Sequence, residues 1–436
     1  AGASVGLGNI WRFPYLAAKY GGGIFLIIYI VLALTFGYTM IVAETAIGRM
    51  TRKSPVGAFK SFGKKKWLSF GGWINAVIPV LIVPYYSVIG GWVIKYLVEY
   101  FRGNAKLLAE DGYFTDFISN GVSTELCFVA FCAFTLIIIF AGVQNGIERV
   151  SKIMMPILIV LSVIIAVYSV TRPGALAGVK YFLVPNVKNF SWMTVVSAMG
   201  QMFYSLSIAM GILITFGSYM KKDTAIEDST RNVEIFDTGI AIMAGLMIIP
   251  AVFAFSGGDP NTLQAGPSLM FITIPKVFQN MGFGTVIGIV FFLLVLFAAV
   301  TSSIALTESA VSTFEDELGW GRKKATVLVG VIMLVLGSLS SLGYGPLAGI
   351  KIIGMQFLDL FDFLTNSVMM PIAALLTSLL VSRVVGIDKI EEEIIHGESA
   401  FRRKKVFVVM IKYLCPVFAI IILLSSVANA LGWIKM

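Results

Sequence analysis

The chain has 436 residues, of which 58% are hydrophobic and 13% are charged, and its mean hydropathy is +0.89. Soluble domains carry roughly 25% charged residues, so this composition excludes a soluble globular protein and predicts an integral membrane protein. The formal net charge of +9 does not indicate nucleic-acid binding, because the basic residues are sorted by membrane side, as described below.

Apolar runs of about 20 residues, the length that a transmembrane helix requires, recur along the chain. The alternation typical of a membrane β-barrel is absent, so the runs predict an all-α membrane protein. Eleven spans are expected, at residues 1–19, 24–48, 70–101, 124–142, 150–171, 193–219, 236–256, 282–312, 323–341, 350–380 and 406–432. Since Ala1 already lies within the first run and no cleavage site follows, we expect no signal peptide, and we expect part of helix 1 to precede this residue.

Spans one and six each contain a short polar interruption. The first is SVGLGNIWRFPY, Ser4–Tyr15, and the second is Ser205–Gly211 within GQMFYSLSIAMGILITF. Lipid cannot satisfy the backbone groups that an unwound turn exposes, so such turns are tolerated where they line a site. Gly6 and Gly8 permit the first turn and let a ligand approach the backbone, although close helix packing is the alternative explanation for either motif alone.

Five spans separate the two breaks, and because five is odd the two halves of the chain enter the membrane from opposite faces. Inverted repeats that each open with a broken helix are typical of secondary transporters, whose binding site lies at the breaks. Freed carbonyls suit a hard cation such as sodium, and the positive N-terminal end of a half-helix suits a carboxylate. The pattern therefore predicts a mid-membrane site for a cation and an anionic group.

Basic residues concentrate in the loops on one side of the expected membrane. These loops follow spans two, six, eight and ten, and their basic residues are Arg49, Arg52, Lys53, Lys60, Lys64, Lys65, Lys66, Lys221, Lys222, Arg231, Arg322, Lys323, Lys324, Arg383, Lys389, Arg402, Arg403, Lys404 and Lys405. The positive-inside rule then places the start of the chain in the cytoplasm. An odd number of spans places the C-terminus outside.

Little else in the sequence suggests chemistry. Cys127, Cys132 and Cys415 all fall within spans and predict no disulfide framework. His396 lies in an acidic loop, EEEIIHGE, where a solvated surface position is expected. No metal-binding cluster and no nucleophile motif is present, so an enzyme is the least expected class.

Several motifs together resemble the neurotransmitter:sodium symporter family. They are GNIWRFPYLAAKYGGGIF (Gly8–Phe25), NGIERVSKIMMPIL (Asn145–Leu158), FYSLSIAMG in span six, FAAVTSSIAL (Phe297–Leu306) and FLDLFDFLTNSVMMP (Phe357–Pro371). The resemblance covers nearly the whole chain and is closest to bacterial members with eleven spans. It implies the LeuT-like fold, with one inverted repeat at 1–171, a second at 193–380, and helix 11 at 406–432. It also implies the bacterial cytoplasmic (inner) membrane.

The resemblance implies two sodium sites. The first matches the Ser4 carbonyl, Asn9, Ser205, Asp237 and the carboxylate of the substrate. The second matches the carbonyls of Gly2, Val5 and Ala298 and the hydroxyls of Thr301 and Ser302. Positions 298, 301 and 302 share one helix face and offer only oxygen, which a hard cation prefers. Helix–helix hydrogen bonding is the alternative role for the two hydroxyls.

Asp237 indicates whether transport is expected to require chloride. Chloride-dependent members of the family have an asparagine at the matching position and a serine one turn later, where this chain has Ala241. The resemblance implies that Asp237 supplies the charge that chloride supplies elsewhere, so no chloride is expected. The alternative is an interfacial acid that caps helix 7.

Gly6 indicates the class of substrate, because monoamine carriers of the family have an aspartate there. An α-amino acid would bring its own carboxylate, which the Tyr86 hydroxyl would bind, beneath a lid formed by Tyr204. The implied substrate residues are Ala3, Ser4, Gly8, Ile82, Tyr86, Tyr204, Ser205, Ser207, Ala209, Met210, Ser303 and Leu306. None of these residues is an acid or a base, so the substrate is expected to have a neutral, mostly apolar side chain. An aliphatic or small side chain is favoured over an aromatic one.

The same resemblance implies the gates of a transporter. Arg12 and Asp362 match an extracellular gate, and Asp316 and Tyr219 match an intracellular one. Glu44 is expected to brace the broken part of helix 6, and Glu308 to belong to a buried network.

The sequence therefore predicts a sodium-coupled amino-acid symporter that works by alternating access. Its partners would be an amino acid, sodium and the lipid bilayer, with no nucleic acid. A sodium-independent or proton-coupled exchanger of the same fold, and a non-transporting amino-acid sensor, are the alternatives. A channel is a weaker one, since inverted broken helices do not form a continuous pore.

Overall fold

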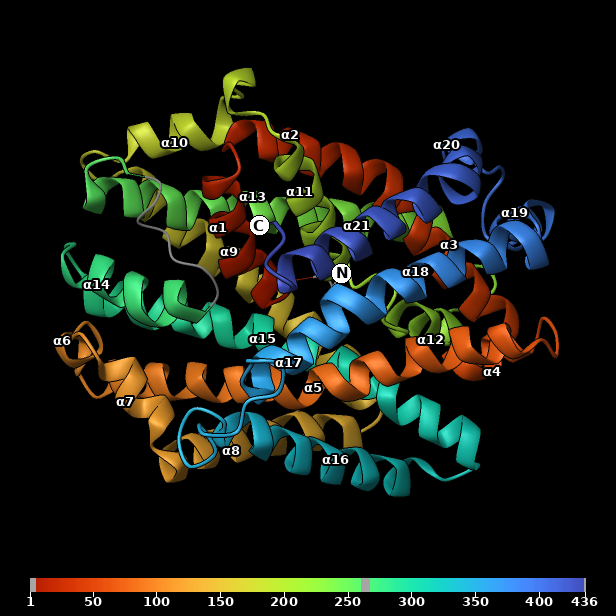
Figure 1. Cartoon of the computed structure of the whole chain (residues 1–436), viewed down its shortest axis with the longest axis horizontal. Coiled ribbons are helices and arrows are strands. Elements are labelled where there is room, and N and C mark those ends of the chain that lie inside the picture. Colours follow the sequence, from red (N-terminus) through yellow and green to blue (C-terminus); the bar gives the residue numbers. More distant parts are fainter. Residues whose placement is uncertain (1–4, 260–266, 435–436) are drawn as a thin grey trace.

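The computed structural model describes residues 5–259 and 267–434 of the chain (Figure 1). Within these ranges the chain forms helices, turns and loops, with no β-strand. Nine helices of the described part are long and apolar enough to cross a membrane. They are Gly23–Thr51, Lys66–Phe101, Gly121–Phe140, Val143–Val170, Ile226–Ser256, Gly284–Leu318, Arg322–Leu342, Phe357–Val385 and Lys404–Ala430. The two expected spans missing from this set are the broken ones.

Five of the nine spans are uninterrupted α-helices, namely α5 (Lys66–Phe101), α8 (Gly121–Phe140), α13 (Ile226–Ser256), α15 (Gly284–Leu318) and α16 (Arg322–Leu342). Each of the other four contains at least one π-helical turn. Two of them are α2 (Gly23–Leu32) with η2 (Ala33–Gly37) and α3 (Tyr38–Thr51), and η3 (Val143–Glu148) with α9 (Arg149–Val170). The other two are α17 (Phe357–Asp362) with η7 (Phe363–Met369), α18 (Met370–Leu379) and η8 (Leu380–Val385), and α20 (Lys404–Val409) with η9 (Met410–Leu414) and α21 (Cys415–Ala430). Short helices in the connections are α4 (Pro55–Lys60), α6 (Ala105–Leu108), α7 (Tyr113–Ser119), α10 (Leu176–Leu183), η4 (Val187–Asn189), η6 (Leu269–Thr273), α14 (Ile274–Gln279) and α19 (Ile387–Ile395).

Both predicted breaks are present. Span one consists of the π-helical η1 (Gly8–Arg12) and α1 (Phe13–Lys19), while residues 1–4 lie outside the described part. Span six consists of α11 (Trp192–Ser205) and α12 (Ile212–Tyr219), joined by an unwound turn. In that turn Ser207, Ala209 and Gly211 have φ angles of 56°, 58° and 72°. Residues other than glycine rarely adopt this left-handed region, so the turn is held by its surroundings.

Several span boundaries differ from the prediction, most of all the start of α13, and one expected loop contains a helix. Helix α13 begins at Ile226 rather than at residue 236, because its first turns are polar but bury one face that includes Glu227, Thr230 and Glu234. Asp237 therefore lies well inside α13, so the alternative that it caps the start of helix 7 is wrong. The acidic loop before His396 contains helix α19, which buries Ile390 and Ile394 on one face. His396 itself is exposed, as predicted.

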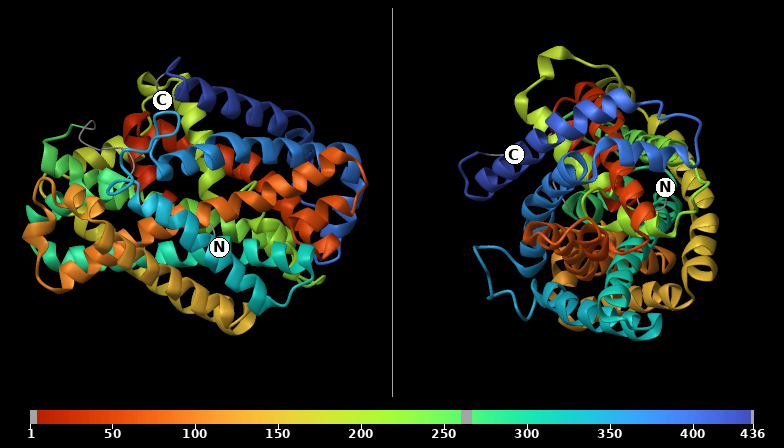
Figure 2. Two further views of the ribbon diagram at one scale, coloured as in Figure 1. Left: turned by 60° about the horizontal axis from the view of Figure 1, so that its bottom comes forward. Right: turned by 90° about the vertical axis from the view of Figure 1, so that its right-hand side faces the viewer.

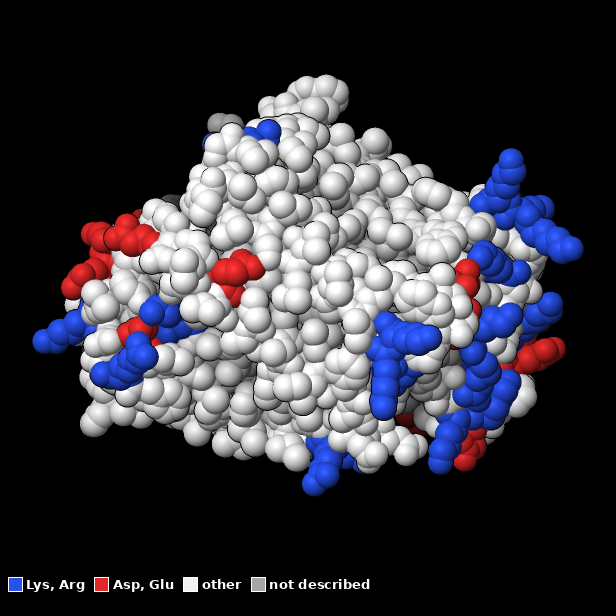
Figure 3. Space-filling view, turned by 90° about the horizontal axis from the view of Figure 1, so that it is seen from below, with Lys and Arg blue, Asp and Glu red and all other residues white. Residues whose placement is uncertain are grey.

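The long helices run roughly side by side along the longest axis of the molecule (Figure 1). Helices α4 and α19 lie near one end, which we call the basic end, and α6, α7 and α14 lie near the other. Lysines and arginines dominate the basic end, and the middle of the visible face carries few charges (Figure 3). Figure 2 shows the bundle along its long axis, and within it η1 and α1 pack against α2, α11 and α13 with most of their residues buried. Helix 1 and the turn of span six are thereby placed at the centre of the bundle.

Candidate functional site

A buried carboxylate joins the two broken helices. Asp237 is fully buried, and its Oδ1 accepts hydrogen bonds from Asn9 Nδ2 at 2.8 Å and from Ser205 Oγ at 2.5 Å. Asn9 Nδ2 also donates to Ser205 Oγ at 2.8 Å. The structure thus brings together three of the four residues expected at the first sodium site. Ser4 lies outside the described residues.

Tyr29 completes this cluster and was not predicted from the sequence. Its hydroxyl donates to Asp237 Oδ2 at 2.5 Å from helix α2. Asn9 Oδ1 in turn accepts from the backbone N–H of Gly6 at 3.0 Å, which fixes the orientation of the amide. Asn9, Ser205, Tyr29 and Asp237 together carry amide, hydroxyl and carboxylate oxygens, which suit a hard cation such as sodium, although here the Asn9 amide nitrogen faces Asp237 and the amide oxygen faces Gly6. Within residues 5–259 and 267–434, no group of three or more histidine, cysteine or acidic side chains has an arrangement that could hold a metal ion.

A second set of oxygens joins helix α15 to the start of helix 1. Thr301 Oγ1 lies 3.3 Å from the Val5 carbonyl and 3.1 Å from the Ala298 carbonyl. Ser302 Oγ lies 3.2 Å from the same Val5 carbonyl. All four residues are buried, and each offers oxygen alone. Gly2, the fifth expected member of this site, falls outside the described residues.

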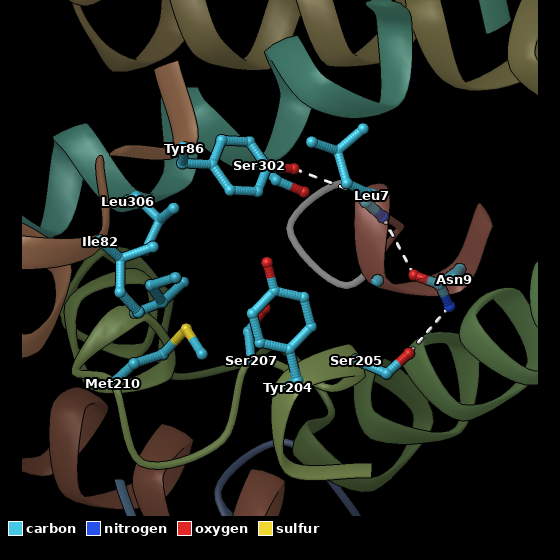
Figure 4. Close-up of a pocket in the computed structure, with 13 residues that line it drawn as sticks. Leu7, Asn9, Ile82, Tyr86, Tyr204, Ser205, Ser207, Met210, Ser302 and Leu306 are labelled. Atoms are coloured by element: carbon cyan, nitrogen blue, oxygen red, sulfur yellow. Dashed lines mark hydrogen bonds between the residues drawn. The ribbon is translucent and has the colours of Figure 1, made fainter. Parts of the chain in front are cut away.

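A small cavity of about 30 Å³ lies between these two sets (Figure 4). Its lining is Gly6, Leu7, Gly8, Asn9, Ile82, Tyr86, Tyr204, Ser205, Ser207, Met210, Ile212, Ser302 and Leu306. Eight of the expected substrate residues are in this lining. Ala209 and Ser303 are not in it; the Ala209 N–H donates to Glu44, and the Ser303 hydroxyl is hydrogen-bonded to Thr135. Ala3 and Ser4 are outside the described part of the chain.

Tyr86 and Gly6 shape the end of the cavity nearest helix 1. The Tyr86 hydroxyl accepts from the Leu7 backbone N–H at 3.3 Å. A Cβ at Gly6 would lie 2.4 Å from Ser302 Oγ and 3.2 Å from the Tyr86 hydroxyl. Any side chain at position 6 would therefore have to displace the Ser302 hydroxyl.

Tyr204 separates this cavity from an outer one. Among the described residues it alone lines both the central cavity and a larger cavity of about 490 Å³. Its ring lies against Gly8, where a Cβ would come within 2.4 Å of the ring. About 30 Å³ holds only one or two water molecules, so a larger solute could enter only if the residues of the lining moved.

The expected outer gate residues both line the outer cavity but do not form a direct ion pair. The Arg12 guanidinium lies 5.3 Å from the centre of the Tyr204 ring, a cation–π contact. Asp362 instead accepts hydrogen bonds from the Tyr85 hydroxyl at 3.1 Å and from the Asn366 side chain. Arg12 is thus positioned by the lid tyrosine.

The expected inner gate residues belong to two separate contacts. Asp316 Oδ2 accepts from the Ser54 backbone N–H at 2.5 Å. The Tyr219 hydroxyl donates at 2.7 Å to Glu308, which is fully buried and forms an ion pair with Arg322 at 2.6 Å. The expected buried network around Glu308 is therefore present. Arg322 was predicted only as one of the basic loop residues.

Two buried polar side chains brace the breaks. Glu44 Oε1 accepts from the Ala209 N–H at 2.8 Å, which confirms that Glu44 supports the turn of span six. Gln201 Nε2 donates to the Gly8 carbonyl at 2.9 Å and supports the break of span one, a role that was not predicted. A polar residue just before FYSLS was the available signal for Gln201.

Comparisons with known proteins agree with this arrangement. The model of the sodium:neurotransmitter symporter family matches residues 1–112 and 115–433. An uncharacterized sodium-dependent transporter, YhdH, of Bacillus subtilis is 34% identical over 98% of this chain and 95% of its own length. An uncharacterized sodium-dependent transporter of Haemophilus influenzae is 31% identical over the same shares of the two chains. A human sodium- and chloride-dependent GABA transporter 2 is 26% identical over 90% of this chain and 72% of its own length.

Among solved structures, MhsT in complex with L-phenylalanine superposes with a TM-score of 0.87 at 34% identity. The match covers 98% of this chain and 96% of that one. The fold is the LeuT-like fold, with two inverted five-helix repeats and broken helices 1 and 6. The chain belongs to the sodium:neurotransmitter symporter family, and it is a sodium-dependent membrane transporter rather than an enzyme.

Proposed function

We propose that this transporter imports a neutral, mostly apolar α-amino acid together with sodium and without chloride. The observation that carries the proposal is the buried Asp237 carboxylate, which holds Asn9 of helix 1 and Ser205 of helix 6 beside the central cavity. A fully buried carboxylate that is held by neutral hydrogen-bond donors alone is costly unless a cation compensates its charge. Sodium would compensate it, and the carboxylate of the amino acid would be the further ligand.

A second sodium would bind where Thr301 and Ser302 meet the Val5 carbonyl. These hydroxyls now donate to that carbonyl, and on sodium binding their lone pairs would turn toward the ion. An ion there ties α15 to helix 1 and favours the state closed at the basic end. Release of this ion would free helix 1, which is the basis of alternating access.

Two features support an α-amino acid as substrate. Position 6 is a glycine and supplies no acidic side chain, so the substrate would bring its own carboxylate to sodium and to the Tyr86 hydroxyl. Ile82, Met210 and Leu306 make the rest of the cavity apolar. MhsT, the structural relative, binds L-phenylalanine. In this chain we favour aliphatic or small side chains over aromatic ones, because Tyr204 leaves a small cavity.

The charge distribution supports an orientation. Basic side chains dominate the end that carries α4 and α19, which places that end in the cytoplasm (Figure 3). The N-terminus would then be inside and the C-terminus outside, in the cytoplasmic membrane of a bacterium.

The test is uptake of labelled neutral amino acids into proteoliposomes, with sodium exchanged for potassium and chloride exchanged for gluconate. We expect saturable uptake that needs sodium and persists in gluconate. Uptake that is indifferent to sodium would favour an exchanger of the same fold. Loss of uptake in gluconate would overturn the proposed role of Asp237.

A further inference from the structure

A groove at the basic end is lined by charged residues and by apolar residues, as a site for a lipid would be. It has a volume of about 550 Å³ and lies between α2, α13 and the loop that precedes α20. We call it the α2–α13 groove and define it by Leu34 of η2, by Arg231, Ile235 and Gly239 of α13, and by Arg402. Its size lies within the range of about 300–1,000 Å³ that is usual for small-molecule sites.

The wall formed by α13 changes character along its length. Arg231, Ile235 and Gly239 follow one another at intervals of one turn, so they share a face. Arg231 is nearest the basic end, and Gly239 lies roughly 12 Å farther along the axis, toward the middle of the membrane. The groove is thus charged at its mouth and apolar in its depth.

The apolar part of the groove is not filled by protein. Ile235 is 56% exposed and Leu34 is 46% exposed. A Cβ built at Gly239 would meet nothing within 4 Å. An acyl chain could therefore lie along α13 from Ile235 to Gly239 without displacing a side chain.

The acids at the mouth are already bound within the protein. Glu227 accepts a hydrogen bond from the Tyr38 hydroxyl. It also accepts from the backbone N–H of Arg402 at 2.7 Å and from that of Arg403 at 3.2 Å. Glu234 pairs with Arg403 at 2.7 Å, and Asp228 pairs with Arg402 at 3.1 Å.

Unlike Arg402 and Arg403, Arg231 is not paired with an acid of the groove. It is exposed, and it forms no ion pair or hydrogen bond with any side chain in the described part of the protein. A guanidinium in this position suits a phosphate, which it can bind through two parallel hydrogen bonds.

We propose that the α2–α13 groove binds one anionic phospholipid of the leaflet at the basic end. Its phosphate contacts the guanidinium groups of Arg231 and Arg402, and one of its acyl chains lies against Leu34, Ile235 and Gly239. The bound lipid connects α2 and α13 to the helix that begins at Lys404, and so adds to the stability of the intact bundle.

The test measures binding of phosphatidylglycerol to the delipidated protein in detergent. Native mass spectrometry counts the bound lipids, and the rise in Tm with lipid concentration gives an apparent Kd. Arg231→Gln removes the charge at the mouth. Gly239→Leu fills the depth, at a place where the structure has space for a side chain. Lys324→Gln is the matched control, since it removes one exposed charge at the same end but on α16, away from the groove.

We expect one tightly bound lipid on the wild type and on Lys324→Gln. Arg231→Gln should weaken the apparent Kd about fivefold, the effect of one basic residue near a membrane surface. Gly239→Leu should abolish the lipid-dependent rise in Tm while leaving the Tm of the lipid-free protein unchanged or higher. Equal binding by all four proteins would overturn the proposal. An equal rise in Tm with inorganic phosphate alone would also overturn it, because the site would then recognise the anion and not a lipid.

Discussion

Asp237 is the residue on which the proposed chloride independence depends. Asp237→Asn removes the buried charge, so sodium should bind more weakly at the first site. We expect sodium-driven uptake in gluconate to fall at least about tenfold, since a hydrogen bond or ion contact to a charged group contributes about 1.5–3 kcal/mol. Initial uptake rates in proteoliposomes measure this effect.

A paired substitution makes the role of Asp237 more specific. Asp237→Asn combined with Ala241→Ser reproduces the expected pair of chloride-dependent relatives, so chloride should restore part of the lost uptake. Asp223→Asn is the control, because Asp223 is an exposed acid outside the site. Recovery that is the same in chloride and in gluconate would contradict the proposal.

The sequence identified the residues of this cluster better than their partners. The family resemblance implied Asn9, Ser205 and Asp237 as one set, polar side chains are rare within apolar spans, and the structure places the three in contact. Tyr29 did not stand out, because a tyrosine in an apolar run is an ordinary core residue until the direction of its hydroxyl is known. Direction depends on how α2 packs against α13, which the sequence does not state.

At the scale of elements, the turn between α11 and α12 depends on Glu44. Glu44→Gln keeps a carbonyl oxygen that can accept from the Ala209 N–H, whereas Glu44→Leu leaves that buried N–H without an acceptor. We expect Glu44→Gln to retain substrate binding and Glu44→Leu to lose about 1–3 kcal/mol of stability. Thermal unfolding in detergent and equilibrium substrate binding measure the two effects. Equal behaviour of both variants would show that this hydrogen bond does not hold the turn.

The contact of α15 with helix 1 gives a second prediction at this scale. Thr301→Val preserves the shape of the side chain but removes the hydroxyl near the Val5 carbonyl. The sodium concentration for half-maximal uptake should rise several-fold, and the Hill coefficient for sodium should fall toward one. Thr307→Val is the matched control on the same helix, because the Thr307 hydroxyl bonds only the Ser303 carbonyl of its own helix at 2.7 Å. A shift of equal size in the control would assign the effect to packing.

The elements themselves were predicted to different degrees. Long apolar runs and the polar breaks predicted the spans, because hydropathy alone decides what can cross lipid. The start of α13 was predicted too late, since Glu227, Thr230 and Glu234 are polar yet buried against other helices. Hydropathy cannot distinguish a polar residue in a loop from one that faces the protein interior.

At the scale of the whole molecule, the Glu308–Arg322 pair connects α15, α16 and α12 near the basic end. Arg322→Gln would leave the fully buried Glu308 carboxylate without its cation, which costs about 3–5 kcal/mol when one partner of a buried pair is lost. The double variant Glu308→Gln with Arg322→Gln should be closer to the wild type in thermal stability. If the double variant is as unstable as the single one, the pair acts through something other than charge compensation.

Composition, hydropathy and motif order determined that this chain is an all-α membrane transporter with two broken helices, and the family comparison confirmed it. These properties follow from the sequence because only long apolar segments can cross lipid, and polar breaks in them are tolerated only where they face the protein interior. The repeat boundaries at 1–171, 193–380 and 406–432 stay a prediction. Only the tertiary structure decided that Arg12 contacts Tyr204 rather than Asp362, that Ala209 and Ser303 are not part of the lining of the central cavity, and that Arg231 lines a groove. Those facts depend on which face each helix presents to its neighbours, and packing over long sequence distances sets that choice.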